Sequence, residues 1–170
     1  MAADPGQALF PSRGHDHAAC VAGALERAAG ICARRGARLT PIRRRVLELV
    51  WASHAPIGAY DILARMEPES RRSAPATVYR ALDFLMAHGF VHRLSSVNAY
   101  VGCGFPDNPH MAQFLICKEC GAVAEMDEPR IEQAIGSAAA QAGFAVESPV
   151  VEVRGRCPAC RKEGAPDARP

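Results

Sequence analysis

Two pairs of cysteines with the same spacing constrain the fold of this chain more than any other feature. Cys117 and Cys120 form the first Cys-x-x-Cys pair, and Cys157 and Cys160 form the second. Two intervening residues let both sulfurs of a pair bind one tetrahedral ion, and Gly121 permits the tight turn that follows the first pair. The four thiolates favour a closed structural Zn²⁺ site, which would attach the end of the chain to the middle of its own domain.

Two other uses of the cysteines are compatible with reduced thiols. The 36 residues between the pairs require a folded element between them. A thioredoxin-like redox pair is disfavoured, because neither pair is expected at the start of a helix that follows a buried parallel strand. An electron-transfer iron site of the rubredoxin type uses similar ligands, and the spacing does not exclude it.

The cellular compartment can be predicted from the start of the sequence, from its apolar stretches and from its cysteines. The first 20 residues lack the charged and apolar segments of a signal peptide, and no apolar stretch has the length of a membrane span. We therefore expect a cytoplasmic protein, in which thiols stay reduced. With 49% hydrophobic residues in a chain of 170, a core can form without disulfides.

Charge is distributed unevenly along the chain. Residues 31–93 contain eleven Arg and five Asp or Glu, a balance of +6, whereas residues 94–170 have a balance of −3. Such asymmetry indicates that the first half contacts a polyanion, although a solvated basic face explains the charge alone equally well.

The first half of the chain has the pattern of a winged helix-turn-helix domain, predicted over residues 18–101. Apolar residues at helical spacing predict helices over residues 18–35, 41–50, 58–66 and 76–88. Two short β-type runs, "FVHRL" and "NAYVG", follow as a hairpin. The last helix would present its polar side to the DNA major groove, with Thr77, Tyr79 and Arg80 outside the apolar stripe. Arg80 is the candidate for reading guanine or holding a phosphate.

The second half predicts a small α/β domain over residues 113–162, joined by a linker over residues 102–112. Strand-like runs flank the first cysteine pair, a helix is expected from Pro129 to Gly143, and "FAVESPVVEVRG" is expected as a strand. The apolar strands could pair across a dimer. Residues 1–17 and 163–170 are predicted to be disordered tails. The fold class is therefore α+β, with a winged-helix domain followed by an α/β dimerisation domain that holds the four-cysteine zinc site.

Several motifs in order resemble the ferric uptake regulator superfamily. They are "RLTPIRRRVLELV", "AYDIL", "PATVYRALDFLMAHGFVHRL", "AYVGC", "PHMAQFLICKECGAV" and "CPAC". The combination of "TVYRALDFL", "GFVH" and "YVGC" is most similar to the sequences of its zinc uptake regulator branch. The resemblance covers about residues 20–162. It implies a homodimeric repressor, not an enzyme, that binds double-stranded operator DNA when zinc is plentiful and has neither a membrane nor a small-molecule substrate as a partner.

The resemblance also implies site residues that spacing alone does not reveal. A regulatory zinc would be held by His92, Cys103, His110 and Glu125, a chemically sensible four-ligand set that would join the two domains. Each of these residues alone has an ordinary structural explanation. Two zinc ions per chain are therefore expected, one structural and one regulatory.

Residues near DNA are implied in the same way. Tyr60 would lie near the DNA together with Tyr79 and Arg80. Arg43, Arg44 and Arg45 would attract phosphates without reading sequence.

Alternatives come from within and outside the family. Iron- and peroxide-sensing relatives usually carry a histidine cluster before the first cysteine pair, whereas here His110 is followed by Met111, Ala112 and Gln113. A sensor of iron, manganese or peroxide is therefore disfavoured. A zinc enzyme needs a nearby acid or base, and no His-x-Glu or His-Glu-x-x-His motif lies near the cysteines.

Further cysteines and histidines lie outside these sets. Cys32 is interpreted as a packing residue. Cys20 and the pair His15 and His17 have no role that the sequence assigns.

Overall fold

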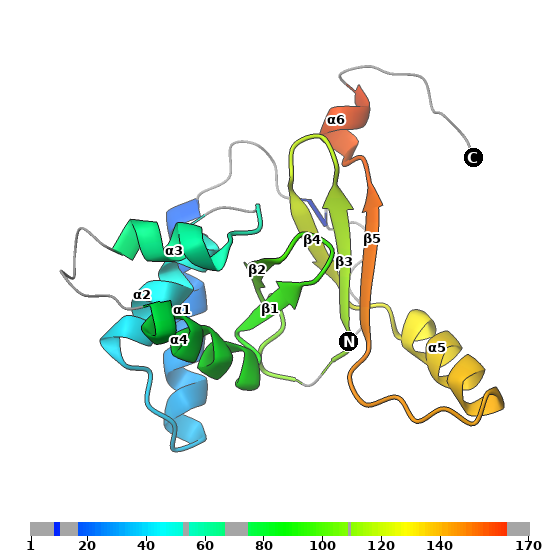
Figure 1. Ribbon diagram of the computed structural model, residues 1–170, viewed down its shortest axis with the longest axis horizontal. Helices are drawn as coiled ribbons and strands as arrows, with labels where there is room; N and C mark the ends of the chain where they lie inside the picture. Colours follow the sequence, from blue (N-terminus) through cyan, green and yellow to red (C-terminus); the bar gives the residue numbers. More distant parts are fainter. Residues whose placement is uncertain (1–8, 11–16, 53–54, 67–74, 109, 163–170) are drawn as a thin grey trace. The chain divides into compact units, whose positions relative to one another are not determined.

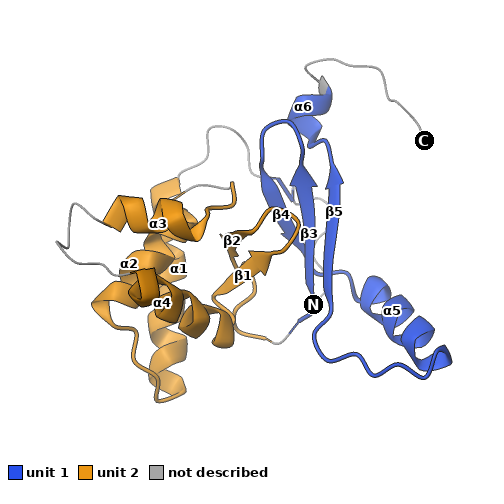
Figure 2. Cartoon of the chain, viewed as in Figure 1, with its two compact units in different colours: residues 1–11, 110–170 blue, residues 12–109 orange. Residues whose placement is uncertain are grey.

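The structure is a computed structural model that describes residues 9–10, 17–52, 55–66, 75–108 and 110–162. The predicted C-terminal tail, most of the predicted N-terminal tail, and Ser73, expected at the start of the fourth helix, lie outside these residues. The chain forms two compact units (Figure 2). We call residues 12–109 the helical unit and residues 1–11 with 110–170 the sheet unit.

The helical unit contains four helices and a hairpin (Figure 1). Its described elements are α1 (His17–Arg34), α2 (Pro41–Trp51), α3 (Ala59–Met66), α4 (Pro75–Ala87), β1 (Val91–Leu94) and β2 (Ala99–Gly102). The start of α2 follows from its sequence, because the Thr40 side chain accepts a hydrogen bond from Arg43 N and Pro41 opens the first turn. The first helix begins at His17, inside the stretch predicted as a tail.

The hairpin follows α4 directly. Gly89 adopts a left-handed conformation with φ of 74°, which ends the helix without the steric cost that a β-carbon would add. The Phe90 amide then donates to Leu85 O at 2.8 Å, so the chain turns back into β1. The two strands pair antiparallel, and a bridge between Ile57 and Tyr100 joins β2 to the segment before α3.

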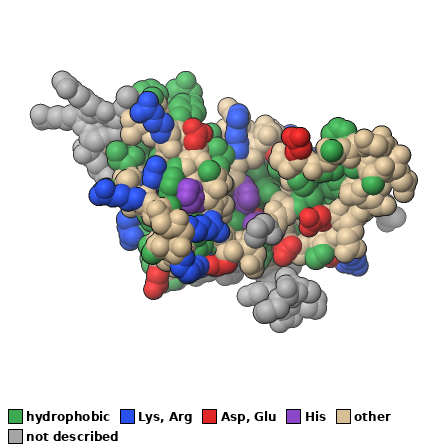
Figure 3. Space-filling view, turned by 90° about the horizontal axis from the view of Figure 1, so that it is seen from below, with side chains coloured by type: hydrophobic (Ala, Val, Ile, Leu, Met, Phe, Trp, Pro, Cys, Tyr) green, Lys and Arg blue, Asp and Glu red, His purple; other side chains and the backbone are tan. Residues whose placement is uncertain are grey.

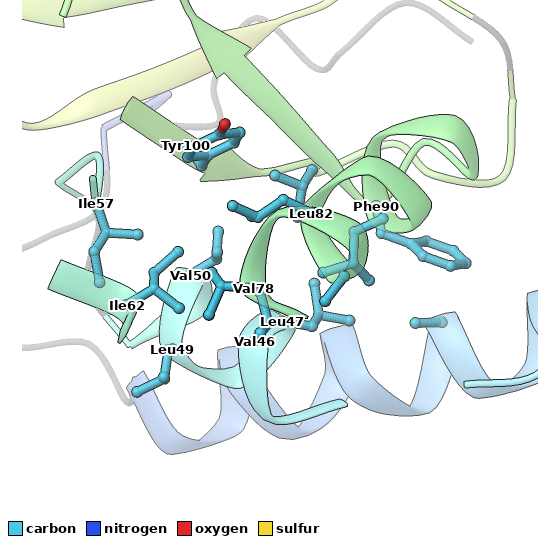
Figure 4. Packing of buried hydrophobic residues seen from close by; sticks show 14 of the residues in the cluster. Val46, Leu47, Leu49, Val50, Ile57, Ile62, Val78, Leu82, Phe90 and Tyr100 are labelled. Carbon is cyan, nitrogen blue, oxygen red and sulfur yellow. The ribbon is translucent and has the colours of Figure 1, made fainter. Parts of the chain in front are cut away.

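The core of the helical unit lies between the helices and the hairpin (Figure 4). Val46, Leu82 and Leu85 are fully buried, and Tyr100 of the hairpin packs against the same cluster. Cys32 belongs to this core, with only 2% of its surface exposed. Together with the sheet unit, this domain confirms the predicted α+β class with an N-terminal winged helix.

The sheet unit is built on three strands in the order β4-β3-β5. Its described elements are β3 (Ala112–Cys117), β4 (Val123–Met126), α5 (Pro129–Gln141), β5 (Val150–Gly155) and α6 (Pro158–Lys162). Strand β3 pairs antiparallel with β4 and parallel with β5, and α5 lies in the connection from β4 to β5 (Figure 1).

The strand predicted from Phe144 begins later than expected, at Val150. Gly143 ends the preceding helical segment in a left-handed conformation, and the Phe144 amide is used to bond back to Ala139 O. Pro149 has no amide hydrogen to give to a strand ladder. The prediction for residues 144–149 was therefore wrong.

The sheet unit has a small core. Phe114, Ile116 and Ala124 are buried, but none of the 13 residues of α5, all of them described, is buried. No residue of strand β5 is buried either. A unit with so little apolar burial needs another source of stability. Within the described residues, no helix combines the length and the hydropathy needed to cross a membrane.

Candidate functional site

Parallel pairing of β3 and β5 explains why the two cysteine pairs meet. In parallel strands both carboxyl ends lie at the same edge of the sheet, and here Cys117 pairs with Gly155. Cys157 follows two residues later, and the Lys118 amide donates to Gly155 O at 2.8 Å. Gly121, with φ of 73°, follows Cys120, and its amide donates to Cys117 O at 3.1 Å, which closes the turn that contains the first pair.

The four thiols have the geometry of a closed metal site. One sulfur from each of Cys117, Cys120, Cys157 and Cys160 lies within 4.8 Å of the others. The Sγ atoms of Cys120 and Cys157 are 3.7 Å apart. Tetrahedral coordination at the usual Zn–S bond length requires sulfurs about 3.8 Å apart. Backbone amides of Cys157 and Cys160 also point at sulfurs of the cluster, at 3.4 and 3.5 Å.

Hydrogen bonds prepare one thiol of this cluster for metal. Burial raises the pKa of Cys117, but backbone amides of Cys120, Cys157 and Glu119 donate to its sulfur and bring the pKa down to about 6. Hydrogen bonds with the thiols of Cys157 and Cys120 raise the pKa of Cys160 to about 12. Cys117 is thus a thiolate at neutral pH, the form that binds metal.

The cysteine pairs do not have the setting of a thioredoxin-like redox dithiol. Cys157 directly precedes α6, and β5 before it is parallel to β3, but no residue of β5 is buried. The first pair follows the buried strand β3, but a turn and not a helix comes after it. Four thiols also converge on one point, whereas a redox dithiol needs only two. Among the described residues, which include every cysteine of the chain, no disulfide is formed.

The second expected ligand set is His92, Cys103, His110 and Glu125. Two of these residues belong to each unit. In the sheet unit, His110 Nε2 and Glu125 Oε1 are 2.8 Å apart, and the two side chains are only 10% and 8% exposed. Glu125 lies on β4 opposite Phe114 of β3, and the side chains of directly paired residues lie on the same face of a sheet. His110 precedes β3 by two residues. A nearly buried imidazole and carboxylate facing each other supply two ligand types that Zn²⁺ uses.

In the helical unit, His92 and Cys103 form the other pair. His92 lies on β1, and Cys103 follows β2, the partner strand. One ring nitrogen of His92 lies within 4.8 Å of Cys103 Sγ. Cys103 is 2% exposed, and its amide donates to Phe90 O at 3.0 Å. Its sulfur accepts from the Phe105 amide at 3.3 Å. The pair is therefore fixed to the hairpin that follows α4.

The described histidines and their neighbours offer no further set. Gln113, in the stretch before the first cysteine pair, is 1% exposed and its amide nitrogen donates to Glu128 O at 3.1 Å. This side chain serves the packing of the sheet unit. In the described part of the sheet unit, the four cysteines are the one group of three or more metal-binding side chains that converge.

Helix α4 has the two faces expected of a DNA-reading helix. Val78, Ala81, Leu82 and Leu85 are buried. Tyr79 and Arg80 are exposed, and Thr77 is half-buried. Tyr60, on α3, is 76% exposed. Basic side chains are distributed over the helical unit (Figure 3).

The three consecutive arginines of α2 differ in their surroundings. Arg44 is exposed, whereas Arg43 lies with its guanidinium carbon 3.5 Å from the centre of the Phe84 ring and donates to Arg38 O. Arg45 pairs with Glu48 at 2.9 Å. The contact between Arg43 and Phe84 joins α2 to α4 and has no signal in the sequence, because the two residues lie on different helices.

The fold and these side chains define a class of protein, the winged-helix metalloproteins. A family model described as "Ferric uptake regulator family" matches residues 34–154. The chain is 44% identical over 137 residues to the zinc uptake regulation protein of Escherichia coli K12, covering 80% of each protein. This chain belongs to the ferric uptake regulator family, a family of transcription regulators, and the predicted membership is confirmed.

Two solved structures are similar in both sequence and fold. A zinc uptake regulator complexed with zinc and DNA has 42% identity and a TM-score of 0.80, covering 84% of this chain and 96% of that one. Holo XcZur has 40% identity and a TM-score of 0.75, covering 81% of this chain and 96% of that one.

Proposed function

We propose that this chain is a zinc-responsive repressor that binds operator DNA of zinc homeostasis genes. The observation that carries the proposal is its 44% identity to a zinc uptake regulation protein across 80% of both chains. A relative of known structure is bound to zinc and DNA. Because its family consists of transcription regulators, we expect it to act in the cytoplasm and to catalyse no reaction.

The cluster of four cysteines is proposed as the structural zinc site. Four thiolates without an open position suit a closed Zn²⁺ site better than a catalytic one, which keeps a place for water. The spacing of the sulfurs also suits an iron site of the rubredoxin type, but the relatives named for zinc favour zinc. Bound there, the ion supplies stability and no chemistry.

The two remaining pairs are proposed to bind one regulatory zinc ion. Each pair offers only two ligands, whereas Zn²⁺ in proteins takes four. His92 and Cys103 would supply an imidazole and a thiolate, and His110 and Glu125 would supply an imidazole and a carboxylate. Together they complete one coordination shell, which gives the expected total of two zinc ions per chain.

Such an arrangement converts zinc occupancy into DNA affinity. His92 and Cys103 lie on the hairpin that follows α4, so holding them to the sheet unit restricts the directions in which α4 can point. Moving a population from 1:99 to 99:1 requires about 5.5 kcal/mol of differential binding. A four-ligand zinc site offers about 10 kcal/mol or more, so this linkage is energetically feasible. Operator DNA must in turn tighten zinc binding by the same factor.

A homodimer is proposed from the apolar surface that the sheet unit leaves exposed. Val150 and Val153 of β5 are 52% and 47% exposed, and Phe144 is 68% exposed. Strand β5 is also an edge of its sheet, with backbone groups available for pairing. A second copy would cover this surface, and two-fold symmetry would present two α4 helices to successive major grooves.

Helix α4 is proposed to read the operator mainly through Arg80. We expect Arg80→Ala to weaken binding to a selected operator by about 1–3 kcal/mol and to change binding to random duplex much less, because a bidentate contact to guanine carries sequence information. The measurement is a binding titration on both duplexes at fixed salt, with an operator obtained by selection from random sequences.

Arg44→Ala is the matched control for this variant. Its exposed guanidinium is the candidate phosphate contact, so both affinities should fall together and the salt dependence should decrease by about one unit of slope. Arg43 and Arg45, which hold partners within the helical unit, should contribute less. If Arg80→Ala lowered the two affinities equally, Arg80 would be a phosphate contact instead.

The second candidate function is a family member that senses iron, manganese or peroxide. The cysteine and histidine of the helical unit favour zinc over a hard cation, since thiolates select softer metals. Titrating each metal in an operator-binding experiment separates the two. Operator binding driven by Fe²⁺ or Mn²⁺, but not by Zn²⁺, would contradict the zinc assignment.

A further inference from the structure

The indole of Trp51 lies directly against the backbone of Gly102. Trp51 is the last residue of α2 and the one tryptophan in the sequence, and Gly102 is the last residue of β2. A β-carbon built on Gly102 would overlap Cε2 and Nε1 of Trp51 and lie 2.7 Å from Cζ2. The aromatic ring therefore occupies the space that any side chain at position 102 would need.

Backbone conformation does not account for this glycine. Gly102 is not among the residues with positive φ, and it pairs with Val91 in a regular antiparallel ladder. Such a position ordinarily suits a β-branched residue. A glycine in a strand also marks a place where another group approaches the backbone closely, and here that group is the indole.

The contact lies next to a proposed zinc ligand. Cys103 follows Gly102, and the Cys103 amide donates a hydrogen bond to Phe90 O, in the residue before β1. The indole holds the preceding α-carbon from the direction of α2, a helix that packs against both β2 and α4. The hydrogen bond to Phe90 O and the Trp51 ring thus fix the backbone from two sides. Only a few rotatable bonds separate this backbone from the Cys103 sulfur.

We propose that Trp51 is a positioning residue for the regulatory zinc site. By packing on Gly102 it holds the end of β2 so that the Cys103 thiolate faces His92 before metal arrives. The inference rests on the proposed function, because it takes Cys103 as a ligand. Metal ligands must be held within about 0.5 Å of the productive geometry, and residues that orient them typically change metal affinity by about 10- to 100-fold.

The test adds a methyl group at the contact and measures zinc affinity. We expect Gly102→Ala, in protein with the four-cysteine site filled, to bind the second zinc about 10- to 100-fold more weakly in competition with a chelator. The Trp51 emission of this variant, measured before the second zinc is added, should shift to the red, because the displaced ring meets more water. The zinc held by the four cysteines should stay bound. Gly23→Ala adds the same methyl in the same unit with nothing within 4 Å, and should match the wild type in both measurements.

A second variant removes the ring instead of crowding it. Trp51→Ala leaves Gly102 unsupported without adding an atom, and we expect a loss of zinc affinity of similar size. In the double variant the added methyl meets no ring, so Gly102→Ala should cause no further loss in the Trp51→Ala background. This comparison remains informative if Gly102→Ala alone destabilises the helical unit.

Two results would overturn the inference. One is a red-shifted Gly102→Ala protein that binds the second zinc as tightly as the wild type. The other is a double variant in which the two losses add. Failure of the proposed function has a different signature, since the wild type would then hold no second zinc or Cys103→Ser would retain it.

Discussion

Cys117→Ser should unfold the sheet unit and leave the helical unit folded. The sheet unit buries few apolar side chains, and its longer helix buries none of its residues. Zinc binding to four cysteines contributes about 10 kcal/mol or more, comparable with the whole stability of a small domain. Cys117 is also the thiol whose pKa is lowered to about 6, so its loss removes the ligand best prepared for metal.

The measurement combines zinc content, circular dichroism and a melting curve. We expect loss of one zinc per chain and disappearance of one melting transition. The circular dichroism spectrum should lose the signals of β3, β4, β5, α5 and α6 and keep the helix signal of α1 to α4. Cys32→Ser is the control, because Cys32 and Cys117 are equally buried at 2% exposure and Cys32 lies in the other core. An unchanged spectrum and melting curve in Cys117→Ser would show that no structural metal binds there.

Cys103→Ser should have the second large effect, on function and not on folding. The thiol lies at the end of the hairpin, and its replacement by a hydroxyl of similar size disturbs little packing. A serine hydroxyl is a poor ligand for Zn²⁺, so the regulatory ion should be lost. Specific binding of operators typically exceeds non-specific binding by about 10³-fold or more, and we expect most of this margin to vanish.

The decisive comparison is operator affinity with and without added zinc. Wild type should respond to zinc, and Cys103→Ser should bind weakly under both conditions while staying a dimer with one zinc per chain. Cys32→Ser again serves as the control, since it removes an equally buried thiol of the same unit. Zinc-dependent operator binding that survives in Cys103→Ser would remove this residue from the sensor.

Local patterns predicted most of the fold. Apolar periodicity and caps such as Thr40-Pro41 located the helices of the helical unit to within a residue or two. The prediction failed at residues 144–149, where apolar composition indicated a strand. Pro149 and the hydrogen bond from the Phe144 amide to Ala139 O exclude these residues from the ladder. The parallel pairing of β3 with β5 was not anticipated either, because it depends on contacts far apart in sequence.

The candidate sites, like the fold, could be predicted only in part. Cys117 and Cys160 could be found from spacing, because both pairs lie in short local motifs. His92 and His110 could not, since their partners are distant in sequence, and only the family resemblance indicated them. The contact of Trp51 with Gly102 could not be predicted from the sequence. Gly102 lies in the run "AYVGC", but no sequence pattern links it to Trp51, because the approach of a ring to a backbone is a property of tertiary packing.

Zinc content in two matched histidine variants tests the central claim, that one ion is held by both units. His92 belongs to the helical unit and His110 to the sheet unit. We predict that His92→Ala and His110→Ala each keep one zinc per chain, lose the same second ion, and lose zinc-dependent operator binding to the same extent. If one variant kept two zinc ions per chain and bound its operator normally while the other did not, the claim of a shared ion would be contradicted.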